Sequence, residues 1–325
     1  MKNVLIILFL FLFICQAGVA QDAEYSQFYA NPIYLNPGFT GTSALPRFAV
    51  NYRNQWPQQG NTFVNYSISF DSYINKLNGG LGLQLQNNRE LNGIVENTSF
   101  YGFYSHHIKI NNWFFVDAGL QAGLSYKKLD YAKLIFPDMI NQLTGERYPG
   151  TSDQPENSSL LYPDFGIGFL AQYESWFGGV SLNHLTQPHE SVFIGDQRGR
   201  LPVKLTVHAG ARTHKLHRGL LSKEYTVSPN LIYQQQGDFK QFNLGIYILE
   251  KSLAGGIWYR QNSGFQPDAV IFMLGFMREK FKIGYSYDLT LSRLSYYSNG
   301  AHEISLIFFT GEKTANRKAL LIPSL

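Results

Sequence analysis

Alternating apolar and polar residues run through almost the whole chain after its first twenty positions. Residues 281–289 read FKIGYSYDL, so an extended strand there places Phe, Ile, Tyr, Tyr and Leu on one face and Lys, Gly, Ser and Asp on the other. Residues 163–173 and 201–212 alternate in the same way. A period of two is typical of β-strands that separate two environments, and the helical period of 3.6 is hard to find here. The pattern predicts an all-β protein.

The alternation resolves into about fourteen predicted strands, most of them long enough to cross a membrane, which takes about 9–11 residues in a tilted strand. They cover residues 46–55, 61–71, 79–90, 94–109, 113–129, 163–173, 175–186, 201–216, 224–236, 239–250, 252–262, 268–278, 280–291 and 301–310. In lipid, every backbone N–H and C=O must be paired within the sheet, so the sheet must close on itself. We therefore predict a transmembrane antiparallel β-barrel of about 14 strands.

The N-terminus has the pattern of an export signal. Lys2 supplies a positive charge, residues 4–14 form an unbroken apolar run, and Gly18, Val19 and Ala20 offer a small-residue cleavage site. The run is too short for a spanning helix, which needs about 20 apolar residues. We predict a cleaved signal peptide over 1–20; a buried N-terminal helix is the alternative. The rest divides into an N-terminal strap or plug segment (21–45), the outer-membrane barrel (46–310) and a periplasmic C-terminal tail (311–325).

Composition agrees with a barrel and narrows the chemistry. Aromatic residues make up 15% of the chain and charged residues 15%. The negative mean hydropathy does not oppose a membrane location, because the inner face of a barrel is polar. The only cysteine, Cys15, lies in the predicted signal peptide, which excludes disulfides and thiolate sites from the mature chain. A net charge of +4 without a block of like charges gives no indication of nucleic-acid binding.

The predicted connections differ in length according to their order. If the first strand rises from the periplasm, the periplasmic connections at 109–112, 173–175, 249–252 and 278–280 are short, and the outer ones at 130–162, 187–200 and 261–267 are longer. This asymmetry is typical of outer-membrane barrels. Two connections depart from it, the tight outer turn near Gly237 and the medium-length periplasmic stretch 71–78. Trp113 and Trp176 fall beside short turns, where tryptophan prefers the lipid headgroups.

The lumen of such a barrel is open unless a segment of the chain fills it. Fourteen strands lie between the self-filled eight-stranded barrel and the water-filled sixteen-stranded one. Segments 21–45 and 130–162 are the candidates to fill the lumen. Some charged and polar side chains fall on predicted inner faces and can line a pore or a ligand path; the favoured interpretation is a solvated lumen wall. They are Asp164, Asp288, Lys204, Arg212 and His208.

Sequence motifs for catalysis or metal binding are missing. The chain holds no Gly-x-Ser-x-Gly, no Walker loop and no His-Glu-x-x-His. His106 and His107 point to opposite faces of one strand, and His214 and His217 lack cysteine or clear carboxylate partners. We therefore predict no catalytic, cofactor or metal site. An enzyme acting on lipid through a serine–histidine pair built across strands stays open.

Some segments go beyond barrel patterning. Residues 25–41 read YSQFYANPIYLNPGFTG, residues 52–57 read YRNQWP, and near the C-terminus stand GYSYD at 284–288 and SYYSNGAHEISL at 295–306. In sequence, order and spacing they resemble the PorP/SprF family of the type IX secretion system, over the whole mature chain. Gly38 departs from the family pattern, where alanine is expected.

This resemblance implies an integral outer-membrane barrel that works with the secretion and gliding machinery. The expected partners are a secreted cargo protein, such as a cell-surface adhesin, recognised through its C-terminal targeting domain, and periplasmic or outer-membrane components of the type IX system, besides the lipid bilayer. The alternative from fold analogy alone is a channel or transporter for hydrophobic or small solutes.

The N-terminal segment contains the candidate site. Its two Asn-Pro pairs restrict the backbone, so we expect a stiff, irregular strap. A plug that seals the lumen and a contact surface for a partner are equally compatible with the sequence. Arg53 and Trp56, at the outer end of the first strand, either contact this strap or a cargo domain or are ordinary rim residues. The candidate residues are Gln27, Phe28, Tyr29, Asn31, Pro32, Asn36, Pro37, Arg53 and Trp56.

Overall fold

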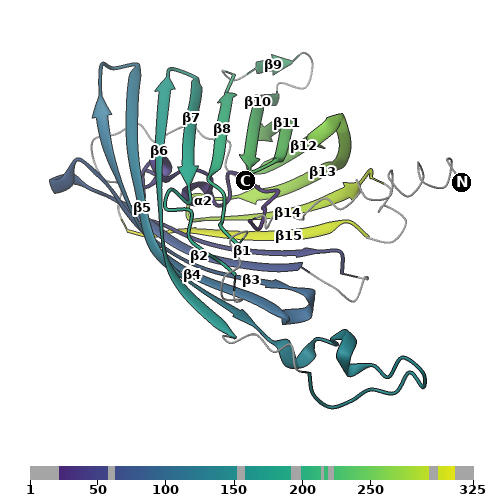
Figure 1. Cartoon of the computed structure of the whole chain (residues 1–325). Coiled ribbons are helices and arrows are strands. Elements are labelled where there is room, and N and C mark those ends of the chain that lie inside the picture. Colours follow the sequence, from purple (N-terminus) through teal and green to yellow (C-terminus); the bar gives the residue numbers. More distant parts are fainter. Residues whose placement is uncertain are drawn as a thin grey trace, which may run out of the picture.

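The chain folds into a closed antiparallel β-barrel in a computed structural model that describes residues 22–57, 63–151, 158–191, 199–213, 216–218, 223–292 and 299–311 (Figure 1). The predicted signal peptide and almost all of the predicted C-terminal tail lie outside these residues. The strands are β1 (Arg47–Gln55), β2 (Phe63–Ile74), β3 (Gly79–Glu90), β4 (Val95–Lys109), β5 (Phe114–Leu129), β6 (Ser159–Tyr173), β7 (Trp176–Asn183), β8 (Lys204–Ala211), β9 (Leu216–Arg218), β10 (Lys223–Gln236), β11 (Phe239–Glu250), β12 (Leu253–Asn262), β13 (Gln266–Met277), β14 (Phe281–Thr290) and β15 (Ala301–Phe309).

Closure follows from the order of the strands in the sheet. Each strand pairs with its neighbours in sequence, β15 pairs with β1, and β10 pairs with both β8 and β11. The three-residue strand β9 pairs only with the start of β10. The ring therefore contains fourteen strands, β1 to β8 and β10 to β15, as the alternation predicts. The described residues contain no helix that is long and apolar enough to cross a membrane.

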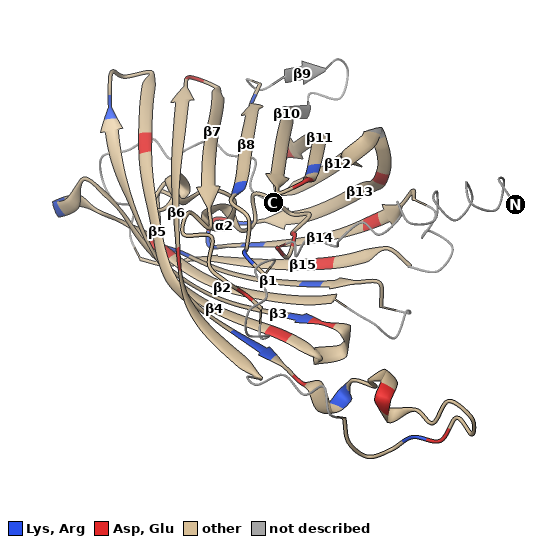
Figure 2. Ribbon diagram, viewed as in Figure 1, with Lys and Arg blue, Asp and Glu red and all other residues tan. Residues whose placement is uncertain are grey.

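The two faces of the wall separate as the alternation predicts. Along β14, Ile283, Tyr285 and Leu289 are exposed on the outside, whereas Gly284 and Ser286 are buried inside. The same pattern on the other strands produces an apolar exterior and a buried interior that is mostly polar, with an apolar cluster that includes Trp258 and Ile271. Charged residues occupy isolated positions on long uncharged strands (Figure 2). The outer face thus suits lipid, and the inner face suits polar contacts.

Strand boundaries differ from the prediction mainly at β6 and β8. β6 begins at Ser159, upstream of Pro163, because that part of β6 extends beyond β7 and Pro163 faces the loop after β7. Proline is tolerated at such an edge. β8 covers only Lys204–Ala211, whereas 201–216 was predicted. The N–H of Leu201 instead donates to the backbone oxygen of Pro188 in the preceding loop. Pro202 has no N–H that could hydrogen-bond to a neighbouring strand.

Loop lengths divide the barrel into two ends. The short-turn end carries the connections 75–78, 110–113, 174–175, 251–252 and 278–280; the long-loop end carries 56–62, 130–158, 184–203 and 291–300. The predicted exception at 71–78 shrinks because β2 continues to Ile74. The tight turn after β10 remains an exception. The connections 91–94 and 263–265 at the long-loop end are also short, and the prediction of a longer loop over 261–267 is wrong because β12 continues to Asn262 and β13 begins at Gln266. The connection that contains β9 is long although it lies at the short-turn end. Trp113 and Trp176 are exposed at the short-turn end.

Short helices lie in the connections and before the first strand. The helix α2 (Pro32–Leu35) and the 3-10 helix η1 (Pro37–Phe39) precede β1. The other 3-10 helices among the described residues are η2 (Asn75–Leu77), η3 (Leu91–Gly93), η4 (Tyr131–Lys133), η5 (Pro137–Met139) and η7 (Ser263–Phe265). Residues 130–151, called the arm below, extend away from the barrel at the long-loop end (Figure 1). The arm therefore does not fill the lumen.

Candidate functional site

The N-terminal residues 22–46, called the plug below, run through the lumen from one end to the other. At the long-loop end, the backbone N–H of Asp22 donates to Gln236 Oε1 at 3.0 Å. At the short-turn end, the N–H of Gly41 donates to Asp71 Oδ2 at 2.8 Å. Asp71 also accepts two hydrogen bonds from Arg47, the first residue of β1. Between these anchors almost every residue of the plug is buried.

Both Asn-Pro pairs begin short helical turns. Pro32 and Pro37 occupy the first position of α2 and η1, where a missing N–H costs nothing. Asn36 is extended, with φ −157°, as the following proline requires, and its side chain accepts a hydrogen bond from the N–H of Gly38 at 2.8 Å. The segment therefore contains two short helical turns, and the side chain of Asn36 caps the second.

Glycines on the inner wall let the plug backbone approach closely. A Cβ added to Gly168 on β6 would lie 2.0 Å from Asn36 Oδ1, and one added to Gly119 on β5 would lie 2.3 Å from the carbonyl carbon of Pro37. A Cβ on Gly80 of β3 would lie 2.2 Å from the carbonyl oxygen of Thr40. These separations leave no room for a side chain. The wall therefore has a groove of glycines fitted to the plug.

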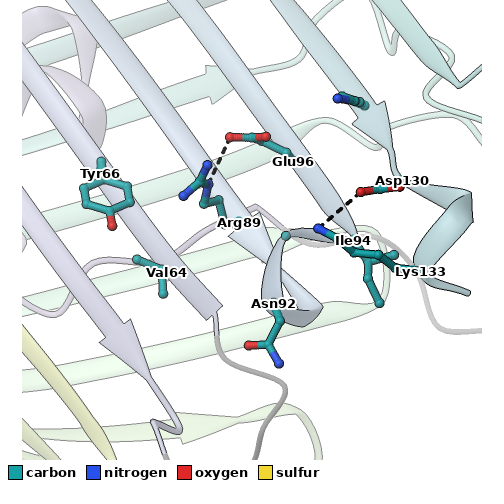
Figure 3. Close-up of a pocket in the computed structure, with 10 residues that line it drawn as sticks. Val64, Tyr66, Arg89, Asn92, Ile94, Glu96, Asp130 and Lys133 are labelled. Atoms are coloured by element: carbon teal, nitrogen blue, oxygen red, sulfur yellow. Dashed lines mark hydrogen bonds and ion pairs between the residues drawn. The ribbon is translucent and has the colours of Figure 1, made fainter.

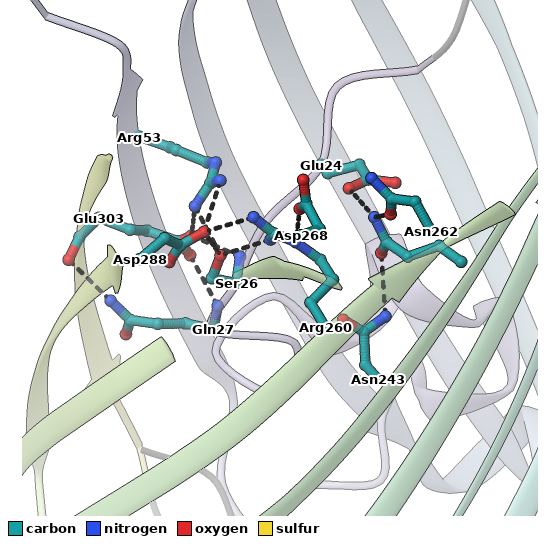
Figure 4. Close-up of polar contacts among 11 residues, drawn as sticks. Glu24, Ser26, Gln27, Arg53, Asn243, Arg260, Asn262, Asp268, Asp288 and Glu303 are labelled. Atoms are coloured by element: carbon teal, nitrogen blue, oxygen red, sulfur yellow. Dashed lines mark hydrogen bonds and ion pairs between the residues drawn. The ribbon is translucent and has the colours of Figure 1, made fainter. Parts of the chain in front are cut away.

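A buried ionic network holds the outer part of the plug (Figure 4). The hydroxyl of Ser26 donates to Asp288 Oδ2 at 2.6 Å, and its backbone N–H donates to Glu303 Oε2 at 2.6 Å. Arg53 donates to Ser26, Asp288 and Glu303 at 2.6, 2.9 and 3.4 Å. Arg260 lies 2.9 Å from the same Asp288 oxygen. Arg260 also donates to Asp268 Oδ2 at 2.6 Å. Two guanidinium groups thus compensate three carboxylates, of which Asp288 and Glu303 are buried.

Side-chain amides continue these contacts along the plug. Gln27 Nε2 donates to the backbone oxygen of Glu303 at 2.9 Å, and Asn31 both donates to Ser67 at 3.0 Å and accepts from Gln84 at 2.8 Å. Each amide thereby pairs with an inward group of the wall, which satisfies the polar atoms that burial would otherwise penalise.

The Asn36 amide makes the deepest of these contacts. Its Nδ2 donates to the backbone oxygens of Phe169 and Val180, at 3.0 and 3.3 Å, and lies 3.1 Å from His208 Nε2. Phe169 and Val180 face each other across β6 and β7. One plug side chain is therefore bound to two adjacent wall strands and to a third strand through His208.

Aromatic rings fill the middle of the lumen. The ring of Phe28 lies 4.9 Å from that of Trp258, and Tyr29 lies 5.7 Å from Phe177 in an edge-to-face arrangement. These rings belong to the largest buried apolar cluster, which also includes Leu35. Such contacts add to the burial of apolar area. Phe28 and Tyr29 are thus directed into the barrel rather than toward an external partner.

A charge cluster fixes the outer end of the plug. His184, directly after β7, lies 2.8 Å from Asp22 Oδ2 through Nε2 and 2.9 Å from Asp164 Oδ2 through Nδ1. Burial alone would lower the pKa of His184, but Asp22 and Asp164 outweigh it and raise that pKa to about 10. Burial would raise the pKa of Asp22, yet His184 and Lys204 hold it below its ordinary value. His184 and Asp22 are therefore both charged at neutral pH and form an ion pair.

The polar residues of the inner wall contact the plug and do not line a water-filled lumen. Asp164, Asp288, Lys204 and His208 are buried, and each contacts the plug directly or through His184. Only Arg212, beyond the end of β8, is partly exposed. The expectation of a solvated lumen wall is therefore wrong for four of the five, because the plug occupies the space that water was expected to fill.

The structure brings together all but one of the candidate site residues. Gln27, Phe28, Tyr29, Asn31, Pro32, Asn36, Pro37 and Arg53 are all buried in the plug and its wall. Trp56 lies at the rim, where its ring contacts that of Phe63 edge-on, and it lines a cavity of about 480 Å³ together with Asp22, Glu24 and Arg53. Ser26, Glu303, Arg260 and the wall glycines were missed, although each inward residue has the polar phase of its strand.

No group of three or more His, Cys, Asp or Glu that could hold a metal ion occurs within the described ranges. His106 and His107 point to opposite faces of β4, outward and inward respectively. His107 Nε2 lies 2.9 Å from the backbone oxygen of Thr40, so it serves the inner end of the plug. His214 lies outside the described residues, as does the side chain of His217.

A closed fourteen-stranded wall with an apolar outer face and a filled polar interior defines an outer-membrane β-barrel. Residues 17–308 match the model of the type IX secretion system membrane protein PorP/SprF family. The match covers most of the chain, so the chain belongs to this family. No curated protein matches it.

Solved barrels are similar to it at low identity. The toluene transporter TbuX of Ralstonia pickettii aligns over 86% of this chain and 93% of its own, with a TM-score of 0.48 and 9% identity. The outer membrane protein Omp33 of Acinetobacter baumannii aligns over 82% and 100%, with a TM-score of 0.43 and 8% identity. A KdgM porin aligns over 81% and 99%, with a TM-score of 0.35 and 9% identity.

Proposed function

We propose that this chain is a non-enzymatic component of the type IX secretion machinery that binds an exported surface protein and periplasmic components of the machine. The exported protein is bound through its C-terminal targeting domain, and the barrel supports its export or its anchoring at the surface. Family membership supports the connection with type IX secretion. The observation that favours a binding role over a conduit is the plug.

The filled lumen favours a binding scaffold over a channel. Ionic, amide and aromatic contacts hold the plug at both ends and along its length. Its release would break the hydrogen bonds of Ser26 to Asp288 and Glu303 and expose the apolar cluster around Phe28 and Tyr29 to water, which is costly. A barrel of this kind offers its two ends to partners more readily than its interior to solutes. The transporter alternative therefore has no specific support from the interior.

The arm is the contact that we assign to the exported protein. It projects from the long-loop end, which faces outward in outer-membrane barrels. Its apolar side chains are exposed: Ile135 to 46%, Leu143 to 96% and Tyr148 to 49%. Apolar side chains at the centre of an interface contribute strongly to binding when a partner covers them. The short turns at the opposite end are left for periplasmic components.

Affinity purification of the tagged full-length chain from native outer membranes tests this proposal. We expect recovery of a surface protein with a C-terminal targeting domain together with periplasmic secretion components. Leu143→Asp should reduce the recovered surface protein about tenfold or more, because burying a leucine contributes about 1.5–3 kcal/mol. Leu291→Asp, an exposed leucine at the same end but outside the arm, is the matched control. Recovery of the barrel alone would contradict the proposal.

Conductance measurements separate the scaffold from a channel. The purified chain in a planar bilayer should give no large, steady conductance, because the plug fills the lumen. Stable open-channel currents from the wild-type chain would favour the transporter instead. Lipase and protease assays address the enzyme alternative, and activity that a single Ser→Ala substitution abolishes would overturn the non-enzymatic role.

A further inference from the structure

The outward face of strands β2 to β5 changes in steps toward the long-loop end. Residues directly opposite one another on these strands form rows across the wall. From the middle outward, the rows are Phe70, Leu83, Gly102 and Ala122; Ile68, Leu85, Phe100 and Leu124; Tyr66, Asn87, Thr98 and Tyr126; and Val64, Arg89, Glu96 and Lys128. The order apolar, aromatic, charged matches the hydrocarbon, interfacial and headgroup layers of a membrane.

The charged row opens into a recess of about 430 Å³ at the base of the arm (Figure 3). Arg89 and Lys128 come from β3 and β5, and Lys133 comes from η4 of the arm. Arg89 Nε lies 3.0 Å from Glu96 Oε1, and Lys133 Nζ lies 3.2 Å from Asp130 Oδ2. These two pairs are partly exposed to solvent. Three cations against two carboxylates give the recess a net positive charge.

An apolar groove of about 530 Å³ lies on the same four strands, nearer the middle of the wall. Its floor is at Gly102 and Ala122, two outward positions with small residues, and Leu81, Leu83 and Leu120 stand around them. A Cβ added to Gly102 would meet only the backbone oxygen of Ala122, at 3.8 Å. The groove is therefore open space on the lipid-facing surface.

The separation of recess and groove matches the length of a lipid. From Glu96 to Gly102, β4 advances six residues, which is about 20 Å at roughly 3.3 Å per residue. A strand tilt of about 40° reduces this to about 15 Å along the membrane normal, which is half of a hydrocarbon core of about 30 Å. A headgroup in the recess thus places the far end of its acyl chain, which spans one leaflet, at the groove.

We propose that this wall binds an anionic, phosphate-bearing lipid of the outer leaflet. Arg89, Lys128 and Lys133 hold the headgroup phosphate, and one acyl chain lies along the groove at Gly102. Cations at this level attract anionic headgroups, and a guanidinium pairs well with phosphate oxygens. The recess opens beside a tyrosine row and above an apolar groove, which a lipid fills and a soluble anion does not. Because Lys133 belongs to the arm, the lipid also fixes the base of the arm.

Native mass spectrometry and a lipid-binding titration on the full chain test the proposal. The chain is placed in nanodiscs of zwitterionic phosphatidylcholine, and the probes are bisphosphorylated lipid A, dephosphorylated lipid A and inorganic phosphate. We expect saturable binding of the bisphosphorylated form only. Equal binding of the dephosphorylated form would overturn the headgroup assignment, and equal binding of inorganic phosphate would identify a site for a soluble anion instead.

Variants on the two parts of the site sharpen the test. The double variant Lys128→Gln/Lys133→Gln should weaken binding about 30-fold, since each cation near an anionic headgroup contributes about a fivefold factor. Lys109→Gln/Lys280→Gln, at the short-turn end, is the matched control and should bind as wild type. Wild-type affinity in the first double variant would overturn the proposal.

The groove is tested by Gly102→Leu, which fills it, with Gly255→Leu as the control. Gly255 is an outward glycine of β12 with no atom within 4 Å of an added Cβ. Gly102→Leu should weaken lipid A binding severalfold, and Gly255→Leu should not. Equal affinities in the two variants would contradict the acyl-chain assignment. Each variant is first checked for a folded barrel by its heat-dependent gel migration. Binding of lipid is independent of the secretion partners, so it can fail while the proposed function stands.

Discussion

The plug and the arm are both irregular, proline-containing segments outside the strand pattern, yet they end in opposite environments. The plug is buried through its whole middle, with short helical turns that begin at Pro32 and Pro37. The arm also has a turn at a proline, at η5, and an isolated bridge between Ile140 and Arg147, but its side chains are mostly exposed. Composition alone therefore does not place such a segment.

The difference lies in what the wall offers each segment. Glycines of β3, β5 and β6 make room for the plug backbone, and inward carboxylates receive its N–H groups. The arm extends past the ends of its flanking strands, where no wall faces it (Figure 1). Complementarity with the wall thus decides burial, and removing it should affect the plug while leaving the arm unchanged.

The largest effect is expected from the buried cation. Arg53→Ala leaves Asp288 and Glu303 with less compensation inside the lumen, and should lower the free energy of unfolding by about 3–5 kcal/mol. Lys133→Ala removes an exposed ion pair of the arm and should cost no more than about 1 kcal/mol. Urea titrations of both variants in lipid vesicles measure the two values. Similar small losses would mean that the network does not hold the plug.

A matched pair of leucines tests apolar packing. Leu35 is buried in the aromatic cluster of the plug, so Leu35→Ala should cost about 2–5 kcal/mol. Leu143 of the arm is 96% exposed, and Leu143→Ala should change stability by no more than about 0.5 kcal/mol. The same titrations report both. A comparable loss at Leu143 would show that the arm is packed in solution.

Two glycines test the fit of the backbone. An alanine at Gly168 would place its Cβ 2.0 Å from Asn36 Oδ1, so the plug or the strand must shift at a cost of about 1–3 kcal/mol. Gly150 of the arm has no atom within 4 Å of an added Cβ, and Gly150→Ala should be close to neutral. Thermal unfolding followed by heat-dependent gel migration compares them. Equal midpoints would remove the glycine groove from the explanation.

The most local effect is expected from pH. The pKa of His184 rises from an ordinary 6.5 to about 10 in the fold, so its stabilising contribution is complete below pH 6.5 and is lost as pH rises through about 10. Hydrogen-exchange protection of residues 22–26 should fall over this range, after correction for intrinsic rates. His184→Gln should remove the pH dependence. Unchanged protection up to pH 10.5 in the wild-type chain would contradict the ion pair with Asp22.

Most of the wall could be predicted from the sequence because each strand separates lipid from a polar interior. The inner residues Lys204, Thr206 and His208 alternate with the outer Leu205 and Val207, and this period survives in the structure. The predicted strand boundaries were wrong where the effect of a proline depends on its surroundings. Pro163 lies inside β6 because no strand pairs with that edge, a fact that belongs to the neighbouring strand rather than to the local sequence.

The plug could be anticipated as a candidate occupant but its contacts could not. Ser26 and Glu303 are separated by 277 positions, so no local pattern connects them. The inward glycines resemble ordinary weak positions of a strand until the segment that they receive is known. The alternation predicts that Asp288 and Lys204 face inward, but it does not predict what they bind. A wall lined by water and a wall that binds a peptide segment use the same residue types.

The pairing of β1 with β15 has a consequence for biogenesis. The plug precedes β1 and is synthesised first, yet its receptors at Asp288 and Glu303 belong to the last two strands. The plug therefore reaches its final contacts only after the last two strands have folded, when β15 pairs with β1 and closes the barrel around it. Sealing the cylinder and loading its interior become a single, late event.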